Sequence, residues 1–259
     1  MTVPRNRVRR SYGPPMPMEK RIKYKISEMA GKVALPLQRI KYYSGIDILC
    51  IAAQTGLDAL RSKIGGLQKQ LTLLPPNVRK NFLYDEGCED WSEQDDVECD
   101  IDMAKDALNE LRKAFCVAAY HHWERSVSEW YHAYSQAPPN QDRPSVKFPR
   151  GHEELENFCQ SCLNISTHKS LKSVTSLVNL LKHNNKNRWQ DVHREWPTIV
   201  PGGRPGNGAD WSGTVRLTDE DLLRVFEVVR LSGPKRPNLS QSAPYEPLPF
   251  TPKPDPTAG

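Results

Sequence analysis

Apolar residues recur at intervals of three and four in two long stretches of the chain, the spacing of one face of an α-helix. The stretches span 37–74 and 103–134, and the first is followed by Pro75 and Pro76. Both therefore predict long helices with one buried side. The residues predicted to be buried are Leu57, Leu60, Ile64, Leu67, Leu71 and Leu74, then Leu108, Leu111, Phe115, Ala119, Trp123, Val127, Trp130 and Tyr134.

Three shorter stretches with the same periodicity follow, at 153–162, 171–182 and 218–231. The last begins with Thr218 and Asp221, which have the spacing of a capping box at a helix N-terminus. The apolar positions of the last two predict buried faces on both helices. These positions are Val174, Leu177, Val178 and Leu181, then Leu222, Val225, Phe226 and Val229.

Shorter signals fill the gaps between these stretches. An amphipathic piece near 18–30 is expected to end before Pro36, because the residue before a proline disfavours the helical conformation. A turn-rich segment before the last helix predicts a short strand pair at 198–200 and 214–217. The sequence therefore predicts an all-α fold: a helical bundle with long antiparallel helices.

Composition indicates that the bundle is flanked by tails. Hydrophobic residues make up 37% of the 259 residues, and the 22 prolines are clustered. Residues 1–17 have no apolar periodicity and predict a disordered basic arm. Residues 233–259 predict a disordered, Pro-rich tail of polyproline character. The bundle domain is accordingly expected to span 18–232.

The chain has no secretory signal and no apolar run long enough to cross a bilayer, so we expect no membrane association and a cytoplasmic location. Cys50 and Cys116 stand among apolar residues, as reduced core cysteines do. Cys159 and Cys162 form one CxxC pair without a second pair, so no metal site is predicted. No P-loop or dinucleotide glycine pattern is present, and no cofactor is expected.

The two signs of charge are segregated, although the net charge is only +5. Residues 1–45 are predominantly basic, whereas 85–102 are strongly acidic without a basic residue. The basic segment is suited either to contact phosphates or to neutralise the acidic segment. A third alternative is that the acidic segment mimics nucleic acid.

Adjacent histidines occur in "YHHWERSVSEWYH" within the second long stretch. On a helix His121 and His122 point about 100° apart, so they cannot both ligate one ion from the same face. His122, Arg125 and Glu129 share one polar side. We interpret this side as the solvated or interface face of a bundle helix.

The stretch "LVNLLKHNNKN" at 177–187 contains the main candidate for chemistry. Asn179 and His183 lie on the polar face of the predicted helix, and the asparagines after His183 are suited to a left-handed helix end. In one interpretation the histidine only closes the helix. In the other, His183 is a general base beside Lys182, with Lys186 and Arg188 attracting a phosphodiester.

The long helix with "AFCVAAYHHWERSVSEW", the helix with "SLVNLLKHN" and the last helix opened by "LTDEDLLRVF" together resemble the HEPN superfamily, over about 103–231. The resemblance implies a helical bundle that often dimerises. Active members are metal-independent endoribonucleases of toxin-antitoxin and phage-defence systems. RNA, a homodimer partner and an antitoxin are therefore the expected partners.

The family motif has four to six residues between an arginine and its histidine, but no arginine occurs at Ser176, Leu177 or Val178. Lysine does not replace the planar fork with which arginine binds phosphate. The resemblance thus predicts a protein that cleaves or binds RNA, with His183 as base and Asn179 as its orienting neighbour. The alternative is a non-catalytic module that dimerises through the apolar face of the helix at 57–74, which we call the 57–74 seam. Its Pro-rich tail would bind a protein partner.

Overall fold

The structure is a computed structural model. It describes residues 18–75, 92–136, 147–200, 210–234 and 248–254. The predicted basic arm at 1–17 and the residues 85–91 of the acidic segment lie outside this part of the chain.

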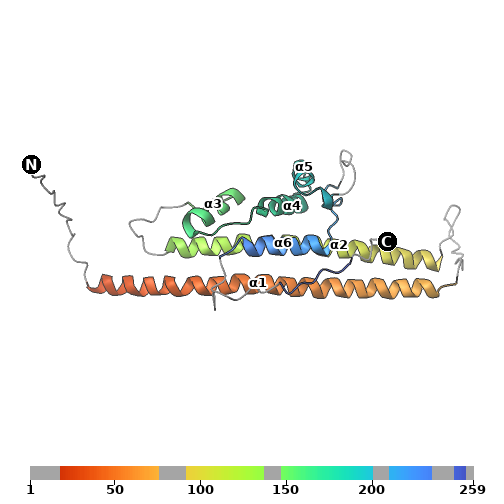
Figure 1. Ribbon diagram of the computed structural model, residues 1–259, viewed down its shortest axis with the longest axis horizontal. Helices are drawn as coiled ribbons and strands as arrows, with labels where there is room; N and C mark the ends of the chain where they lie inside the picture. Colours follow the sequence, from red (N-terminus) through yellow and green to blue (C-terminus); the bar gives the residue numbers. More distant parts are fainter. Residues whose placement is uncertain (1–17, 76–91, 137–146, 201–209, 235–247, 255–259) are drawn as a thin grey trace, which may run out of the picture.

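The predicted all-α fold is confirmed for the described residues. The elements in chain order are α1 (Met18–Leu73), α2 (Glu93–Gln136), α3 (His152–Leu163), α4 (Leu171–His183), α5 (Lys186–Glu195), a 3-10 helix η1 (Pro197–Ile199) and α6 (Asp219–Leu231). Helices α1 and α2 are long and antiparallel, and the shorter helices lie along α2 (Figure 1). Helices α3, α4 and α6 pack against α2, and α5 packs against α4.

Both long helices begin earlier than predicted. Helix α1 continues through Pro36, because one proline removes a single intrahelical hydrogen bond while long helical segments form on both sides. Helix α2 begins at Glu93, inside the acidic segment. There the Ser92 hydroxyl accepts from the Asp95 backbone N–H at 3.2 Å, and the Asp95 carboxylate accepts from the Ser92 N–H at 2.6 Å. This capping box and the acids of the first turn stabilise the helix start.

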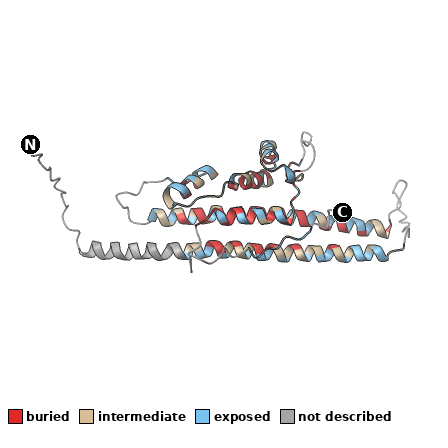
Figure 2. Ribbon diagram, in the orientation of Figure 1, coloured by how far each residue is buried: buried red, intermediate tan, exposed pale blue. Residues whose placement is uncertain are grey.

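One hydrophobic core joins α1, α2, α4 and α6, and Figure 2 shows that the buried residues concentrate on the facing sides of these helices. Most of the predicted core positions of α2 and α4, and all four of α6, are buried. The fully buried large side chains include Trp123, Leu108, Leu177, Phe226 and Leu222. None of the described helices is long and apolar enough to span a membrane.

The 57–74 seam, which was predicted to be a dimer surface, packs against α2 of the same chain. Leu57 and Ile64 are buried against α2, with exposed fractions of 0% and 1%. Leu60, Leu67, Leu71 and Leu74 are only partly buried. The apolar stripe of α1 therefore packs onto a second helix of the same chain, as is usual for a bundle.

The predicted strand pair at 198–200 and 214–217 does not form. Residues Pro197–Ile199 are a 3-10 helix, and one backbone bond, from the Arg216 N–H to the Ile199 carbonyl at 2.8 Å, links the two segments. The Asn109 amide takes the place of a strand partner. It donates to the Val215 carbonyl and accepts from the Leu217 N–H, both at 2.9 Å. These backbone groups are thereby satisfied without a sheet.

Part of the segment predicted to be a disordered tail is packed. Residues 248–254 run over α1 and α6 without regular secondary structure, and Phe250 is 5% exposed beside the Phe226 ring. The Thr251 N–H donates to Gln54 of α1 at 2.9 Å. We call residues 248–254 the C-terminal strap. The prediction failed because one aromatic residue and a few backbone hydrogen bonds anchor a segment that lacks apolar periodicity.

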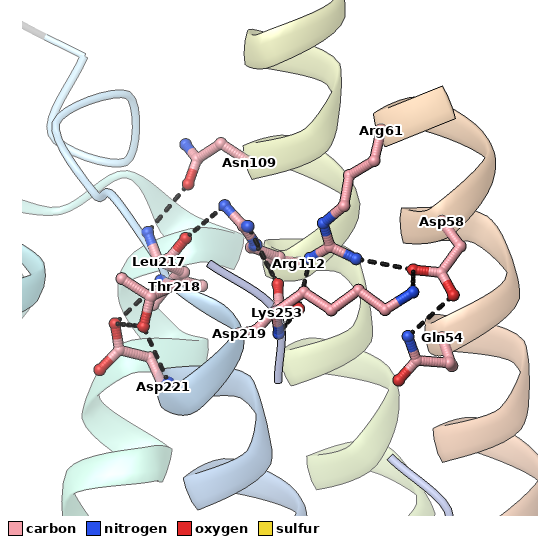
Figure 3. Close-up of polar contacts among 10 residues, drawn as sticks. All are labelled: Gln54, Asp58, Arg61, Asn109, Arg112, Leu217, Thr218, Asp219, Asp221 and Lys253. Carbon is pink, nitrogen blue, oxygen red and sulfur yellow. Dashed lines mark hydrogen bonds and ion pairs between the residues drawn. The ribbon is translucent and has the colours of Figure 1, made fainter. Parts of the chain in front are cut away.

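A buried carboxylate ties the strap to three helices (Figure 3). Asp219, the first residue of α6, is 0% exposed and accepts hydrogen bonds from Arg61 of α1 and from Arg112 Nε at 3.0 Å. The Lys253 backbone N–H donates to the same carboxylate at 3.1 Å, and its ammonium pairs with Asp58 at 2.9 Å. We call Asp219 and these partners the Asp219 network. Each of its charges has an opposite charge in contact.

Candidate functional site

His183 is the last residue of α4, and the residues after it form a tight helix-to-helix corner. Asn184 adopts the left-handed conformation (φ 44°, ψ 49°), as predicted, and its N–H donates to the Leu180 carbonyl at 2.9 Å. The Asn185 side chain then accepts from the Asn187 N–H at 2.8 Å and caps α5. The sequence "HNN" thus ends one helix and begins the next.

The corner is fixed to the rest of the molecule by two further contacts. The Asn184 side chain accepts from the Ser212 backbone N–H at 2.9 Å. Trp189 of α5 is 4% exposed, and its indole N–H donates to the Thr214 hydroxyl at 3.0 Å. Helix α5, which the sequence analysis missed, is short and has few apolar residues, so its periodicity gave no signal.

The predicted site residues lie near one another in the chain but make no mutual hydrogen bond. His183 and Lys182 are exposed, and Asn179 is half-buried one turn earlier on α4. Lys186 is half-buried at the start of α5, and Arg188 pairs with Asp191 at 3.6 Å. Within the described part of the chain, no acid forms an ion pair with Lys182 or Lys186. We call Lys182, His183, Lys186 and Arg188 the α4–α5 corner.

A second region, which the sequence analysis did not identify as a site, is a groove between α1, α2 and the start of α3. Its volume is about 1060 Å³, slightly above the usual range of small-molecule pockets. We call it the α1–α2 groove. It is lined by the polar face of α2 that carries His122, Arg125 and Glu129, and also by His121. The sequence predicted this face to be solvated or an interface, and the groove is its structural context.

His122 forms part of the wall of the groove and lies directly against α1. Its Nε2–H donates to the Tyr42 carbonyl at 2.9 Å, and its ring stacks on the Tyr42 ring with centroids 5.3 Å apart. Because a carbonyl only accepts, Nδ1 is the unprotonated nitrogen of the neutral imidazole. Burial lowers the pKa of His122, the hydrogen bond to Tyr42 opposes this, and the nearby Arg125 lowers it further.

His122 can lie directly against α1 because residue 45 is a glycine. A Cβ atom at residue 45 would overlap the His122 ring, so any larger residue there would displace the imidazole. A glycine in the middle of a helix costs about 0.5–1 kcal/mol relative to alanine. The close approach of the ring explains the glycine at position 45.

His152, at the first position of α3, is held by surrounding side chains. The Tyr120 hydroxyl lies 2.9 Å from its Nδ1, and Glu156 lies 3.4 Å from its Nε2. Burial lowers the pKa of His152, although the neighbouring Glu156 acts in the opposite direction. Both half-buried histidines are therefore poised to be neutral at neutral pH.

Three cationic side chains from different parts of the fold line the groove. They are Lys41 of α1, Arg125 of α2 and Arg150 in the segment before α3, and all three are exposed. No described acid forms an ion pair with any of them. Two acids also line the groove: Glu124, which His121 contacts at 2.8 Å, and Glu129. The groove therefore has an excess of uncompensated positive charge.

The cysteines give no metal centre in the described residues. Cys50, Cys116 and Cys159 are buried, and all five described cysteines are free. Burial raises the pKa of Cys50 and of Cys159 to about 12, which keeps these thiols protonated and unreactive. In the described ranges, no three histidine, cysteine or acidic side chains are grouped so that they could hold a metal ion.

The all-α fold thus presents cations at the α4–α5 corner and in the α1–α2 groove, and of these six side chains only Arg188 forms an ion pair with a described acid. No family model, curated protein or solved structure matches the chain. Its chemistry therefore has to be inferred from its own residues.

Proposed function

We propose that this protein binds RNA through the α4–α5 corner. The observation that carries the proposal is the exposed cluster of Lys182, His183 and Arg188 beside Lys186 at the N-terminus of α5. Backbone N–H groups at a helix N-terminus favour an anion, and lysine and arginine side chains neutralise phosphates. The resemblance to the HEPN superfamily over 103–231 supports the same substrate class.

Cleavage of the bound RNA is a further part of the proposal. The exposed imidazole of His183 is accessible to a 2'-hydroxyl group, and Lys182 can place a positive charge beside the reacting phosphate. Asn179, one turn earlier on α4, is the residue assigned to orient the base. Such a reaction requires no metal ion.

Binding is tested by titrating a fluorescent single-stranded RNA at several salt concentrations. Replacing both Lys182 and Lys186 by Gln should weaken binding and reduce the slope of log K against log salt by about 1.4, because each phosphate contact contributes about 0.7. The matched control is Lys63→Gln with Lys69→Gln, two exposed lysines of α1. Equal slopes for both double variants would contradict binding at the corner.

Cleavage is tested by incubating the wild-type chain and His183→Ala with mixed RNA in the presence of a chelator. The proposal expects fragmentation by the wild type and a loss of at least 100-fold in the variant, the usual contribution of a general base. Intact RNA with both proteins, together with salt-dependent binding, would leave RNA binding as the function and remove the nuclease.

A homodimer is the second candidate, and an exposed face of α1 favours it. Leu37 and Ile48 are separated by three helical turns, as are Ile40 and Ile51, so all four lie on one face. Each is more than half exposed. A second copy of the chain would cover this face, whereas Leu57 and Ile64 of the predicted 57–74 dimer surface are already buried within the chain. Sedimentation of the wild type and of Ile51→Glu, a residue outside the α1–α2 groove, tests this: a monomeric wild type contradicts it.

A further inference from the structure

The α1–α2 groove combines positive charge with an apolar wall. Lys41, Arg125 and Arg150 approach it from three separate elements, and Ile48 and Leu155 are among its apolar lining residues. Two acids, Glu124 and Glu129, also line the groove, so its three cations leave an excess of one formal positive charge. None of the three cations is ion-paired with a described acid, so their mutual repulsion is only partly offset in the free protein. An anionic ligand would offset the remaining repulsion between the three cations.

The chemistry of the groove narrows the class of ligand. A carboxylate has two oxygen atoms, whereas a terminal phosphate group has three strong acceptor oxygens and a charge of about −1.5 to −2 at neutral pH. Three cations on different sides are therefore matched better by a phosphate group. Guanidinium groups such as those of Arg125 and Arg150 bind it with paired N–H donors. The apolar wall fits a ring or a hydrocarbon next to the phosphate.

We propose that the α1–α2 groove is a binding site for a small organic phosphate monoester. Lys41, Arg125 and Arg150 contact the phosphate, and Ile48 and Leu155 contact the apolar part. His122 also lines the groove and keeps its position because Gly45 has no side chain. This site differs from the α4–α5 corner, which contains none of these residues, so the proposal does not depend on RNA binding.

The probe is phenyl phosphate, which carries a phosphate monoester on an apolar ring. Calorimetric titration of the full chain should give saturable binding that is tighter than binding of benzoate or inorganic phosphate. Arg125→Gln and Lys41→Gln should each raise Kd about tenfold, as expected for the loss of one charge-assisted hydrogen bond. Gly45→Ala should also weaken binding, because the new methyl group displaces the His122 ring.

The matched controls are Lys63→Gln on α1 and Arg194→Gln on α5, both exposed residues outside the groove. Neither should change Kd by more than twofold. Circular dichroism and unfolding curves show whether each variant is folded. The proposal is overturned if no binding of phenyl phosphate is detected at about 10 mM, which would put Kd above the millimolar range. It is also overturned if benzoate binds equally well, or if the control substitutions weaken binding as much as Arg125→Gln.

The same titration separates this proposal from the proposed function. A Lys182→Gln, Lys186→Gln variant should lose RNA affinity and keep phenyl phosphate binding, whereas Arg125→Gln should do the reverse. Loss of both ligands in either variant would mean that one continuous surface binds RNA, and would contradict a separate small-molecule site.

Discussion

The Asp219 network and the α1–α2 groove both involve the long helices α1 and α2, but the cations of the network are ion-paired and those of the groove are not paired with a described acid. In the network, Arg61 and Arg112 meet the buried carboxylate of Asp219, and Lys253 meets Asp58. In the groove, Lys41 and Arg125 have no ion pair with a described acid. Paired charges in the interior hold elements together, whereas unpaired charges around a cavity are suited to a ligand.

The largest effect is expected from breaking the Asp219 network. Asp219→Asn removes the buried carboxylate that contacts Arg61 and the 2% exposed Arg112, while Arg61 keeps its ion pair with Asp58. Loss of this buried charge should lower the free energy of unfolding by about 3–5 kcal/mol. Urea unfolding followed by circular dichroism measures this. A loss below about 1 kcal/mol, the value of a surface pair, would show that the network is not structural.

A smaller loss is expected at Asn109, a neutral side chain next to the Asp219 network. Asn109→Ala removes hydrogen bonds to both the Val215 carbonyl and the Leu217 N–H and leaves these backbone groups without partners. The free energy of unfolding should fall by about 1–3 kcal/mol. The matched control is Asn157→Ala on the exposed side of α3, which should change it by less than about 0.5 kcal/mol.

Acid should lower the free energy of unfolding through His122 and His152, two half-buried histidines that line the α1–α2 groove. The pKa values of His122 and His152 are lowered in the folded chain, so the unfolded chain binds more protons as the pH falls below about 6.5. Stability is therefore complete above the unfolded pKa and decreases below it. Unfolding curves at pH 5.5 and 7.5 should differ less for His122→Gln than for the wild type. An unchanged difference would contradict the assignment of His122.

The smallest effect on stability is expected in the groove. Arg125→Gln removes an exposed cation without an ion-pair partner, so the free energy of unfolding should stay within about 0.5 kcal/mol of the wild type. A loss of 2 kcal/mol or more would mean that Arg125 has a structural role and would remove the contrast with Asp219.

The fold was largely predictable from apolar spacing. The 3.6-residue period identified the cores of α1, α2, α4 and α6, and the Thr218–Asp221 capping box is present as predicted. Helix α2 begins at Glu93, ten residues before the predicted start at 103, although Ser92 and Asp95 have the same capping-box spacing. Helix α5 and the C-terminal strap were missed because long-range contacts, not local pattern, hold Trp189 and Phe250 in place.

The sites were predictable only in part. The left-handed Asn184 and the exposed His183 follow from local sequence. The groove does not, because it depends on Lys41, Arg125 and Arg150, which are far apart in the chain and are brought together by tertiary packing. The contact between Gly45 and His122 also cannot be recognised from the sequence, although a glycine inside a predicted helix often marks a close approach.

The contrast between paired and unpaired charge is tested most directly by urea unfolding of the wild type and of Arg125→Gln, each with and without phenyl phosphate. A ligand that binds the folded state at 100 times its Kd stabilises it by about 2.7 kcal/mol. We expect the probe to raise the unfolding midpoint of the wild type and to raise that of Arg125→Gln much less. Equal midpoints with and without phenyl phosphate in the wild type, or an equal rise in both proteins, would contradict the account.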